Sequence, residues 1–254
     1  MKTWQIYLLV GIIVVLGIGA MLYAKARTGN ENSNNSNASN SQVSNDNSNV
    51  TNSNNSNSNN SNSNQTAATS GCTPDLNKNA MQDKINLKNQ FVTLSVAGFG
   101  NVKIQLYDQD APKTVENFLR LTHAGYYDCL TFHRIAKNFV IQGGDPTGTG
   151  SGGESAFGGE FADELNPNSP SGQAGYKKGV VAMANRGPNT NTSQFFIMLA
   201  DNQLPYSYTI FGKVVAGQDV VDKIGQADII PQMGPTDGAP KTKIVITKAT
   251  ISSN

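Results

Sequence analysis

Two stretches of the chain carry the polar side chains that could do chemistry. The first runs from Phe132 to Gln142 and contains Arg134, whose guanidinium stays charged, eight residues before the amide of Gln142. The second runs from Met183 to Ile197 and adds amides and apolar side chains. An arginine, two amides and several apolar side chains include no nucleophile and no general base. We therefore expect a reaction that needs no proton transfer rather than one that breaks a bond.

Read together, the two stretches resemble the signature segments of the cyclophilin family of peptidyl-prolyl cis-trans isomerases, here a membrane-anchored, bacterial-like member. The segments read Phe-His-Arg-Ile-Ala-Lys-Asn-Phe-Val-Ile-Gln from Phe132 and Met-Ala-Asn-Arg-Gly-Pro-Asn-Thr-Asn-Thr-Ser-Gln-Phe-Phe-Ile from Met183. The resemblance extends over about residues 91–251. It implies an isomerase that assists folding and acts on proline-containing segments of unfolded or exported proteins, without a cofactor.

Rotation about an X-Pro peptide bond is a reaction that such a site can serve. The barrier is about 18–20 kcal/mol because rotation destroys amide resonance, so unaided exchange is slow. In the twisted amide the prolyl nitrogen becomes pyramidal and can accept a hydrogen bond, which a guanidinium beside an apolar pocket can donate. One preorganised donor in a water-poor site is typically worth roughly 10²–10³ in rate.

The resemblance assigns roles residue by residue. It makes Arg134 the catalytic donor. Core packing is the ordinary alternative for any one of the apolar residues, and a structural salt bridge is the alternative for Arg134. The proline pocket would be formed by Phe139, Val140, Met183, Phe196 and Leu204, with Tyr208 beside it, and the peptide backbone would be held by Gln142, Ala184, Asn185 and Gln194.

The chain departs from better-known members of that family in three places. Gln203 stands where many members have an aromatic indole, and Tyr208 where many have a histidine. These changes put a cyclosporin-type ligand in question more than activity, because the indole is more closely tied to drug binding. Val140 replaces a more usual methionine and should leave a roomier pocket. Cys129 stands where glycine is common, and the sequence offers no physical reason for it.

Other motifs have ordinary interpretations. Residues 148–153 match Gly-x-Gly-x-x-Gly, but no strand–helix context surrounds them, so we expect a surface loop. His133 follows Cys129 by four residues without an orienting acid, and we expect a hydrogen-bonded structural histidine. No Cys-x-x-Cys, His-x-x-x-His or clustered carboxylate motif is present in the sequence, so no metal is expected.

The elements that must position these residues read as mostly β. Residues 92–96 and 102–106 alternate apolar and polar side chains around two glycines, which predicts a hairpin. Residues 115–122 change to helical spacing, with Asp110 placed to cap the helix. Periodicity leaves a sandwich or a barrel open, whereas the resemblance implies a closed eight-stranded antiparallel β-barrel capped by two α-helices. Further strands are expected at 139–142, 179–185, 195–199, 209–214 and 243–251, and a second helix at 219–224.

Composition predicts three parts. Residues 1–27 are expected to form a transmembrane anchor, because residues 4–24 carry no charge and would span about 30 Å as a helix. A cleaved signal peptide is the alternative, because Ala24-Lys25-Ala26 matches a cleavage site. Residues 28–70 are almost entirely Asn, Ser, Thr and Gln and should form a disordered linker. Residues 71–254 then form the isomerase domain, with its core at about 91–251.

Net charge bears on nucleic-acid binding, and cysteine content bears on disulfide formation. The net charge is +1 and there is no Lys/Arg run, so the sequence gives no electrostatic reason to expect nucleic acid. Two cysteines are too few for a disulfide framework. A bridge between Cys72 and Cys129 is one reading, and burial of Cys129 as a small apolar side chain is the favoured one.

We therefore expect a single-pass protein of the cell membrane whose C-terminal isomerase domain lies outside the cytoplasm. The alternative is a non-catalytic module that binds proline-containing segments as a chaperone or adaptor, since the same pocket would serve. Arg134 with Gln142 favours catalysis, because a pure binder needs no donor aimed at the prolyl nitrogen. A cell-surface adhesive β domain would fit the linker but explains neither motif.

Overall fold

The computed structural model describes residue 72 and residues 76–253. The predicted anchor (1–27) and linker (28–70) lie outside these residues. Within the part of the chain that is described, no helix has both the length and the apolar character needed to cross a membrane.

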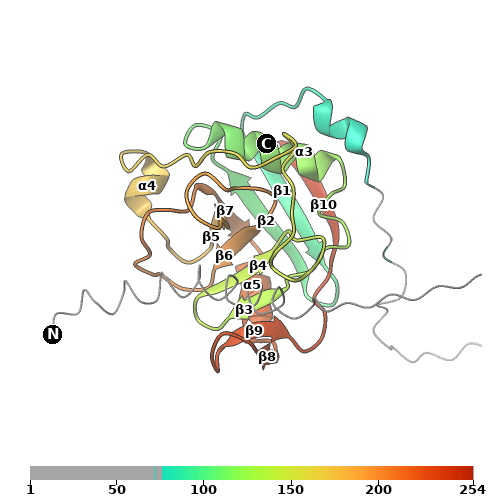
Figure 1. Ribbon diagram of the computed structural model, residues 1–254, viewed down its shortest axis with the longest axis vertical. Helices are drawn as coiled ribbons and strands as arrows, with labels where there is room; N and C mark the ends of the chain where they lie inside the picture. Colours follow the sequence, from blue (N-terminus) through green and yellow to red (C-terminus); the bar gives the residue numbers. More distant parts are fainter. Residues whose placement is uncertain (1–71, 73–75, 254) are drawn as a thin grey trace, which may run out of the picture.

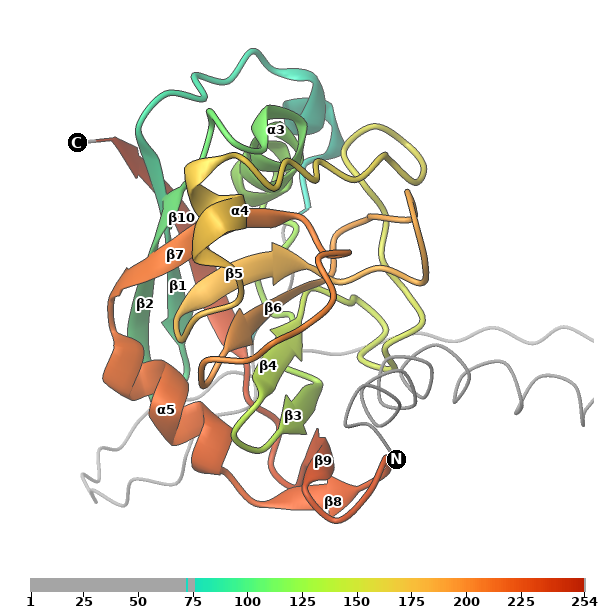
Figure 2. The ribbon, with the colours of Figure 1, turned by 90° about the vertical axis from the view of Figure 1, so that its left-hand side faces the viewer.

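A single antiparallel sheet dominates the described residues, and short helices lie around it (Figures 1 and 2). Its ten strands follow the order β10-β1-β2-β7-β5-β6-β4-β3-β9-β8. The strands are β1 (Gln90–Val96), β2 (Gly100–Leu106), β3 (Arg134–Ala136), β4 (Val140–Gly143), β5 (Val180–Met183), β6 (Phe195–Met198), β7 (Ile210–Ala216), β8 (Ile229–Pro231), β9 (Asp237–Pro240) and β10 (Ile246–Ser253).

The mainly β class is confirmed, whereas the closed eight-stranded barrel is wrong for this sheet. No ladder joins the two end strands of the described sheet, β10 and β8. The reason lies at β3. The edge of β3 that does not face β4 pairs with β9 (Ile135 with Gly238), so this edge cannot pair with β10. The segment just before β3 instead meets the start of β10 through a few backbone hydrogen bonds, such as Phe132 N to Ile244 O at 3.0 Å.

Four short helical segments accompany the sheet in the described residues. They are the 3₁₀ segment η1 (Lys78–Gln82), α3 (Pro112–His123), α4 (Pro170–Ala174) and α5 (Gln218–Gln226). The two longest, α3 and α5, match the two predicted helices, and Figure 2 shows α3 near the top of the sheet and α5 at its lower left.

The start of α3 is not capped as predicted. The N-cap position is Ala111, and the carboxylate of Asp110 accepts a hydrogen bond from Ser171 N (2.8 Å) in α4 instead. The free N–H groups of Lys113 and Thr114 donate to the carboxylate of Glu164 at 2.9 and 2.7 Å. A carboxylate near a helix N-terminus is favourable because of the helix dipole, and here it comes from a residue about fifty positions away.

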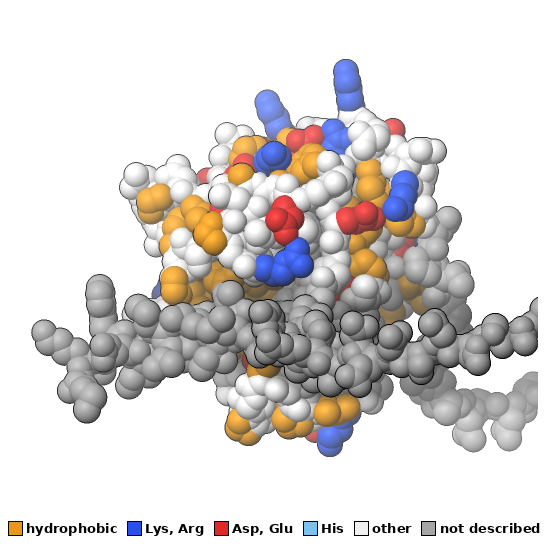
Figure 3. Space-filling view, in the orientation of Figure 1, with side chains coloured by type: hydrophobic (Ala, Val, Ile, Leu, Met, Phe, Trp, Pro, Cys, Tyr) orange, Lys and Arg blue, Asp and Glu red, His pale blue; other side chains and the backbone are white. Residues whose placement is uncertain are grey.

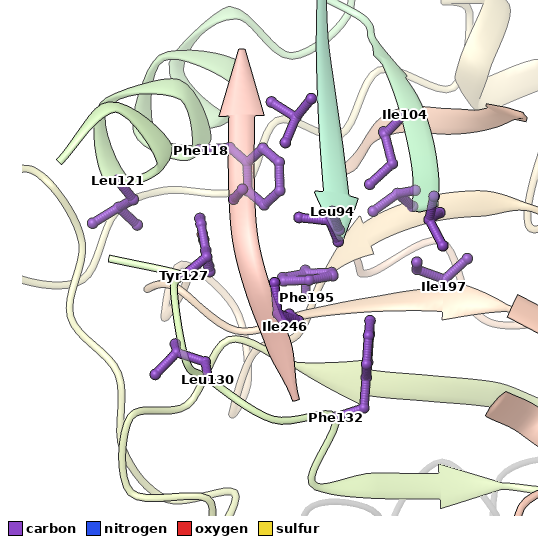
Figure 4. Close-up of a cluster of buried hydrophobic side chains, with 14 of the residues drawn as sticks. Leu94, Ile104, Phe118, Leu121, Tyr127, Leu130, Phe132, Phe195, Ile197 and Ile246 are labelled. Carbon is purple, nitrogen blue, oxygen red and sulfur yellow. The ribbon is translucent and has the colours of Figure 1, made fainter. Parts of the chain in front are cut away.

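The core lies between α3 and one face of the sheet (Figure 4). Phe118 of α3 is fully buried, and its ring centroid lies 4.8 Å from that of Tyr127 and 5.4 Å from that of Phe195 in β6. Tilted and edge-on aromatic pairs of this kind add about 0.5–1.5 kcal/mol each beyond their buried area. This packing gives the strands around the candidate site a rigid support.

A disulfide joins Cys72 to Cys129, with 5.5 Å between the two Cα atoms. The favoured interpretation of Cys129 as a buried apolar residue is therefore wrong. Its backbone φ is +66°, in the left-handed region, which explains why glycine is common at this position in the family that the sequence resembles. Here a cysteine accepts that conformation and bonds covalently to the arm that leads into the domain.

Acidic and basic side chains are interspersed on the face shown in Figure 3. Several form exposed ion pairs, such as Arg186 with Glu160 at 2.6 Å. Such exposed pairs typically contribute between nothing and about 1 kcal/mol each, so the fold depends on its core.

Candidate active site

Arg134 lies at the start of β3, directly opposite Gln142 of β4 in the antiparallel ladder. Its Nη1 donates to Gln142 Oε1 at 2.9 Å. The eight-residue spacing in the sequence therefore corresponds to a β-hairpin. This hairpin places both side chains on one face of the sheet.

The rest of the guanidinium is held by Asp237, the first residue of β9. Arg134 Nε donates to Asp237 Oδ1 at 2.9 Å, and Nη2 donates to Oδ2 at 2.6 Å. Only 13% of the Arg134 side chain and 18% of the Asp237 side chain are exposed, so the pair is largely shielded from water. Sequence analysis missed Asp237, and no motif marks it. Arg134 thus forms the salt bridge that was expected as the alternative to a catalytic role. Whether this arginine can also donate to substrate depends on the guanidinium N–H groups that these contacts do not use.

The amides continue the network away from Arg134. Gln142 Nε2 donates to Gln194 Oε1 at 2.9 Å, and Gln194 Nε2 donates to the backbone oxygens of Gly150 (3.0 Å) and Gly152 (2.7 Å). The side chain of Gln194, predicted to hold peptide, is therefore engaged with the loop that carries these glycines. Its direct effect is to fix Gln142 against that loop.

That loop is the Gly-x-Gly-x-x-Gly segment, and it is organised around the carboxylate of Asp145. Backbone N–H groups of Thr149, Gly150 and Gly152 donate to Asp145 Oδ2 at 3.1, 2.7 and 3.2 Å. Burial would raise the pKa of Asp145, but the hydrogen bonds, led by those from Thr147, outweigh it and lower this pKa. A carboxylate of the chain thus occupies the N–H groups that a phosphate would need, consistent with a structural loop.

The apolar side chains form one cluster on the face of the sheet opposite the main core. It contains Phe139, Val140, Ala184, Phe196, Leu204 and Tyr208, all predicted site residues. The rings of Phe196 and Tyr208 meet edge-on at 5.5 Å. Burial raises the pKa of Tyr208, and the positive charge of Arg134 opposes that rise.

Met183 does not belong to this cluster, so its assignment to the proline pocket is wrong. It is fully buried and packs in the main core. Side chains alternate along a strand, so when Ala182 of β5 faces the apolar cluster its neighbour Met183 must point the other way.

Asn185 and Tyr176 hold the loop that carries Tyr208. Asn185 Nδ2 donates to Ser207 O at 2.8 Å. The Tyr176 hydroxyl donates to Tyr208 O at 2.9 Å and accepts from Tyr208 N at 3.0 Å, so both backbone groups of Tyr208 are fixed by one side chain. Burial raises the pKa of Tyr176, which keeps the hydroxyl protonated and able to donate. Sequence analysis missed Tyr176, because it lies outside both motifs.

Gln203 is exposed and lines, together with Leu204 and Tyr206, a hollow of about 350 Å³. Gly172 and Ala174 of α4 line the same hollow. The position where many members of the resembled family have an indole is thus open and polar in this chain.

His133 is buried, and neither ring nitrogen has a hydrogen-bond partner among the described residues. The predicted hydrogen-bonded histidine is therefore wrong, although the structural role stands. Burial lowers the pKa of His133 below 6.5, with Arg134 acting in the same direction and Asp145 against it.

This lowered pKa predicts a loss of stability in mild acid. Below pH 6.5 the unfolded chain protonates His133 while the folded chain resists, so the free energy of unfolding falls as pH drops towards the folded pKa. The slope contributed by one group is at most about 1.4 kcal/mol per pH unit. Urea unfolding at pH 7 and pH 5 should show a smaller difference for His133→Gln than for the wild type. An unchanged difference in His133→Gln would contradict this origin.

Comparisons with known proteins agree with this geometry. Residues 91–251 match the family model described as cyclophilin type peptidyl-prolyl cis-trans isomerase/CLD. The chain is 48% identical over 155 residues to peptidyl-prolyl cis-trans isomerase-like 1 of Neurospora crassa, covering 60% of this chain and 88% of that protein. It is also 48% identical over 139 residues to the Homo sapiens protein of the same name, covering 54% of this chain and 81% of that protein.

A solved structure is similar as well. The crystal structure of a cyclophilin type peptidyl-prolyl cis-trans isomerase of Cryptosporidium parvum in the presence of the dipeptide Ala-Pro has a TM-score of 0.57 and 38% sequence identity. The similarity covers 65% of this chain and 99% of that one.

Proposed function

The chain belongs to the cyclophilin-type peptidyl-prolyl cis-trans isomerases, and from that premise we propose that Arg134 is the donor that stabilises the twisted X-Pro amide. The chain is an isomerase of X-Pro peptide bonds, as its family and relatives are. The proposal concerns which residues perform the rotation, where the domain works and on which proteins.

A count of the hydrogens on Arg134 supports the donor role. A guanidinium has five N–H donors. Asp237 takes two and Gln142 takes one, which leaves two on the terminal nitrogens Nη1 and Nη2. These are held in a fixed orientation beside the apolar cluster, and a fixed donor costs no reorganisation at the moment of rotation. This three-point fixation of Arg134 is the observation that carries the proposal.

The substrate proline would lie against the apolar cluster. Phe139, Val140, Phe196, Leu204 and Tyr208 offer the apolar surface that a pyrrolidine ring needs, and Ala184 packs against the same cluster. Ala184 and its chain neighbour Asn185 would hold the peptide backbone. No covalent bond forms or breaks in this step. The carbonyl–nitrogen bond rotates, the prolyl nitrogen accepts a hydrogen bond from Arg134 at the twisted geometry, and it releases that bond as the amide becomes planar again.

Replacement of Arg134 tests this assignment. Without the guanidinium the chain should still bind an X-Pro peptide through the apolar cluster while losing acceleration of exchange. Retained binding with lost acceleration is also what separates an isomerase from a module that only binds proline-containing segments.

The proposed setting is the outer face of a membrane. Residues 1–27 would anchor the chain, residues 28–70 would act as a linker, and residues 71–254 would assist the folding of exported proteins. The uncharged run at residues 4–24 and the polar composition after it support this arrangement. A bacterial-like membership rests on the same segments, while the two relatives named above come from a fungus and a mammal.

Protease added to intact cells that make the protein should remove the C-terminal domain, because a domain outside the membrane is accessible. Immunoblotting for the domain before and after treatment measures this. A cytoplasmic marker that survives shows that the cells stayed intact. Full protection of the domain in such cells, with digestion after lysis, would contradict the proposed orientation.

A further inference from the structure

We infer that Asp237 is a positioning residue for the isomerase reaction, which acts by holding the guanidinium of Arg134 in the orientation that donates to the prolyl nitrogen. This inference rests on the proposed role of Arg134. It adds to the site a second charged residue, which lies outside both sequence motifs.

The contact has the geometry of a positioning device. Both carboxylate oxygens of Asp237 accept from one edge of the guanidinium, at Nε (2.9 Å) and Nη2 (2.6 Å). A bidentate pair fixes the plane of the guanidinium as well as its place, which a single hydrogen bond cannot do. Gln142 accepts a hydrogen bond from Nη1, the third nitrogen of the guanidinium. Each of the two remaining N–H groups therefore points in a fixed direction.

Backbone contacts on two sides hold Asp237 in place. Asp237 is paired with Ala136 where β9 lies against β3, two residues from Arg134. Its backbone oxygen accepts from Gln232 N at 2.9 Å and from Met233 N at 3.1 Å, which closes the turn between β8 and β9. The backbone of Asp237 is therefore held in two ways, by pairing with β3 and by the hydrogen bonds of its own turn.

The residue after Asp237 shows how closely this hairpin is built. A Cβ atom at Gly238 would lie 2.0 Å from Ile230 O of β8, well inside any real contact, so only glycine lets the two strands approach. The short β8–β9 hairpin thus has little freedom to move Asp237 away from Arg134.

The charge of Asp237 could act in another way, and the two ways predict opposite results. A carboxylate beside Arg134 weakens the positive field that the twisted amide experiences. If field strength decided the rate, neutralising Asp237 would make the enzyme faster. If orientation decides it, the same change frees the guanidinium and makes the enzyme slower, since misplacement of about 1 Å can cost up to 10²-fold.

The test compares full-length wild type with Asp237→Asn, Asp237→Glu, Arg134→Ala and the double variant Arg134→Ala/Asp237→Asn. Cis–trans exchange of an Ala-Pro-containing peptide, followed by NMR, gives kcat and KM. We expect Asp237→Asn to lower kcat by about 10- to 100-fold with KM changed by less than about threefold. The Arg134 Nε–H signal should shift and broaden in the same variant, because its carboxylate partner is gone.

Asp128→Asn is the matched control. Asp128 is also a shielded carboxylate paired with a cation, Lys248 at 2.6 Å, but it contacts β10 rather than Arg134. It should lower thermal stability without lowering kcat. Should Asp237→Asn fail to fold, Asp237→Glu keeps the carboxylate and displaces it by one methylene, and a loss of kcat with a shifted Nε–H signal is expected there too.

The double variant separates positioning from an independent effect. If Asp237 acts through Arg134, the double variant should be no slower than Arg134→Ala alone. An unchanged or raised kcat in Asp237→Asn, or losses that add in the double variant, would overturn the inference while leaving the role of Arg134 intact. A fully active Arg134→Ala variant would instead show that the proposed donor role has failed, and the inference would fall with it.

Discussion

Arg134→Ala is expected to slow catalysed X-Pro exchange by about two to three orders of magnitude. The prolyl nitrogen of the twisted amide would lose its donor, and one preorganised donor is typically worth roughly 10²–10³ in rate. NMR exchange spectroscopy on a short peptide that contains one X-Pro bond measures this directly. Chemical-shift titration of the same peptide should show that the variant still binds it, because the apolar cluster around Phe196 is untouched.

Two further variants test whether the loss of rate is specific to the guanidinium of Arg134. Arg134→Lys keeps a positive charge, but an ammonium cannot bind Asp237 through two parallel bonds and still point a donor at substrate, so we expect most of the activity to be lost. Arg186→Ala removes an exposed arginine whose partner is Glu160, and should leave the rate unchanged. Wild-type acceleration by Arg134→Ala would show that the apolar pocket alone performs the rotation.

Loss of the Cys72–Cys129 disulfide is expected to lower the free energy of unfolding by about 2–4 kcal/mol. The bridge closes a loop of 57 residues in the sequence, and a cross-link of that span restricts the unfolded chain strongly. The arm that it holds also packs on the domain, since Ala80 and Met81 of η1 are buried and Asn77 N donates to Ala124 O at 2.9 Å. Urea unfolding of the wild type and of Cys72→Ser, followed by fluorescence, measures the difference.

The left-handed backbone at residue 129 provides an internal comparison. Cys72→Ser/Cys129→Gly and Cys72→Ser/Cys129→Ala both lack the bridge, but only glycine takes a φ of +66° without strain. We therefore expect the glycine variant to be more stable than the alanine variant by about 1 kcal/mol. Equal unfolding midpoints for the wild type and Cys72→Ser would show that the bridge adds nothing to stability in solution.

Local pattern was enough to place Arg134 and Gln142 together on the sheet. Arg134 and Gln142 are joined by a hairpin, so their spacing in the sequence already determines that they lie side by side. The strands with clear alternation, β1 and β2, and the helix with a clear apolar stripe, α3, were predicted for the same reason, because each is specified by neighbours in sequence. The mainly β class followed from these elements.

Local pattern failed where the partner is distant or the element is short. Strands β3, β8 and β9 have only three or four residues, too few for a period of two to be recognised, so the extra hairpin and the open end of the sheet were not predicted. Met183 shows a different failure. The motif assigned Met183 to the site, but side chains alternate between the two faces of β5, and Met183 faces the core. This alternation could have been inferred from the predicted strand.

The sequence by itself determined the family and the reaction, because these depend on residue types at fixed spacing within one hairpin and one following segment. Only the tertiary structure decided what holds Arg134 in place. Asp237 lies 103 residues further along the chain and reaches the guanidinium only because β9 pairs with β3. The Cys72–Cys129 bridge was decided in the same way, since whether two cysteines pair depends on a Cα separation that the fold sets.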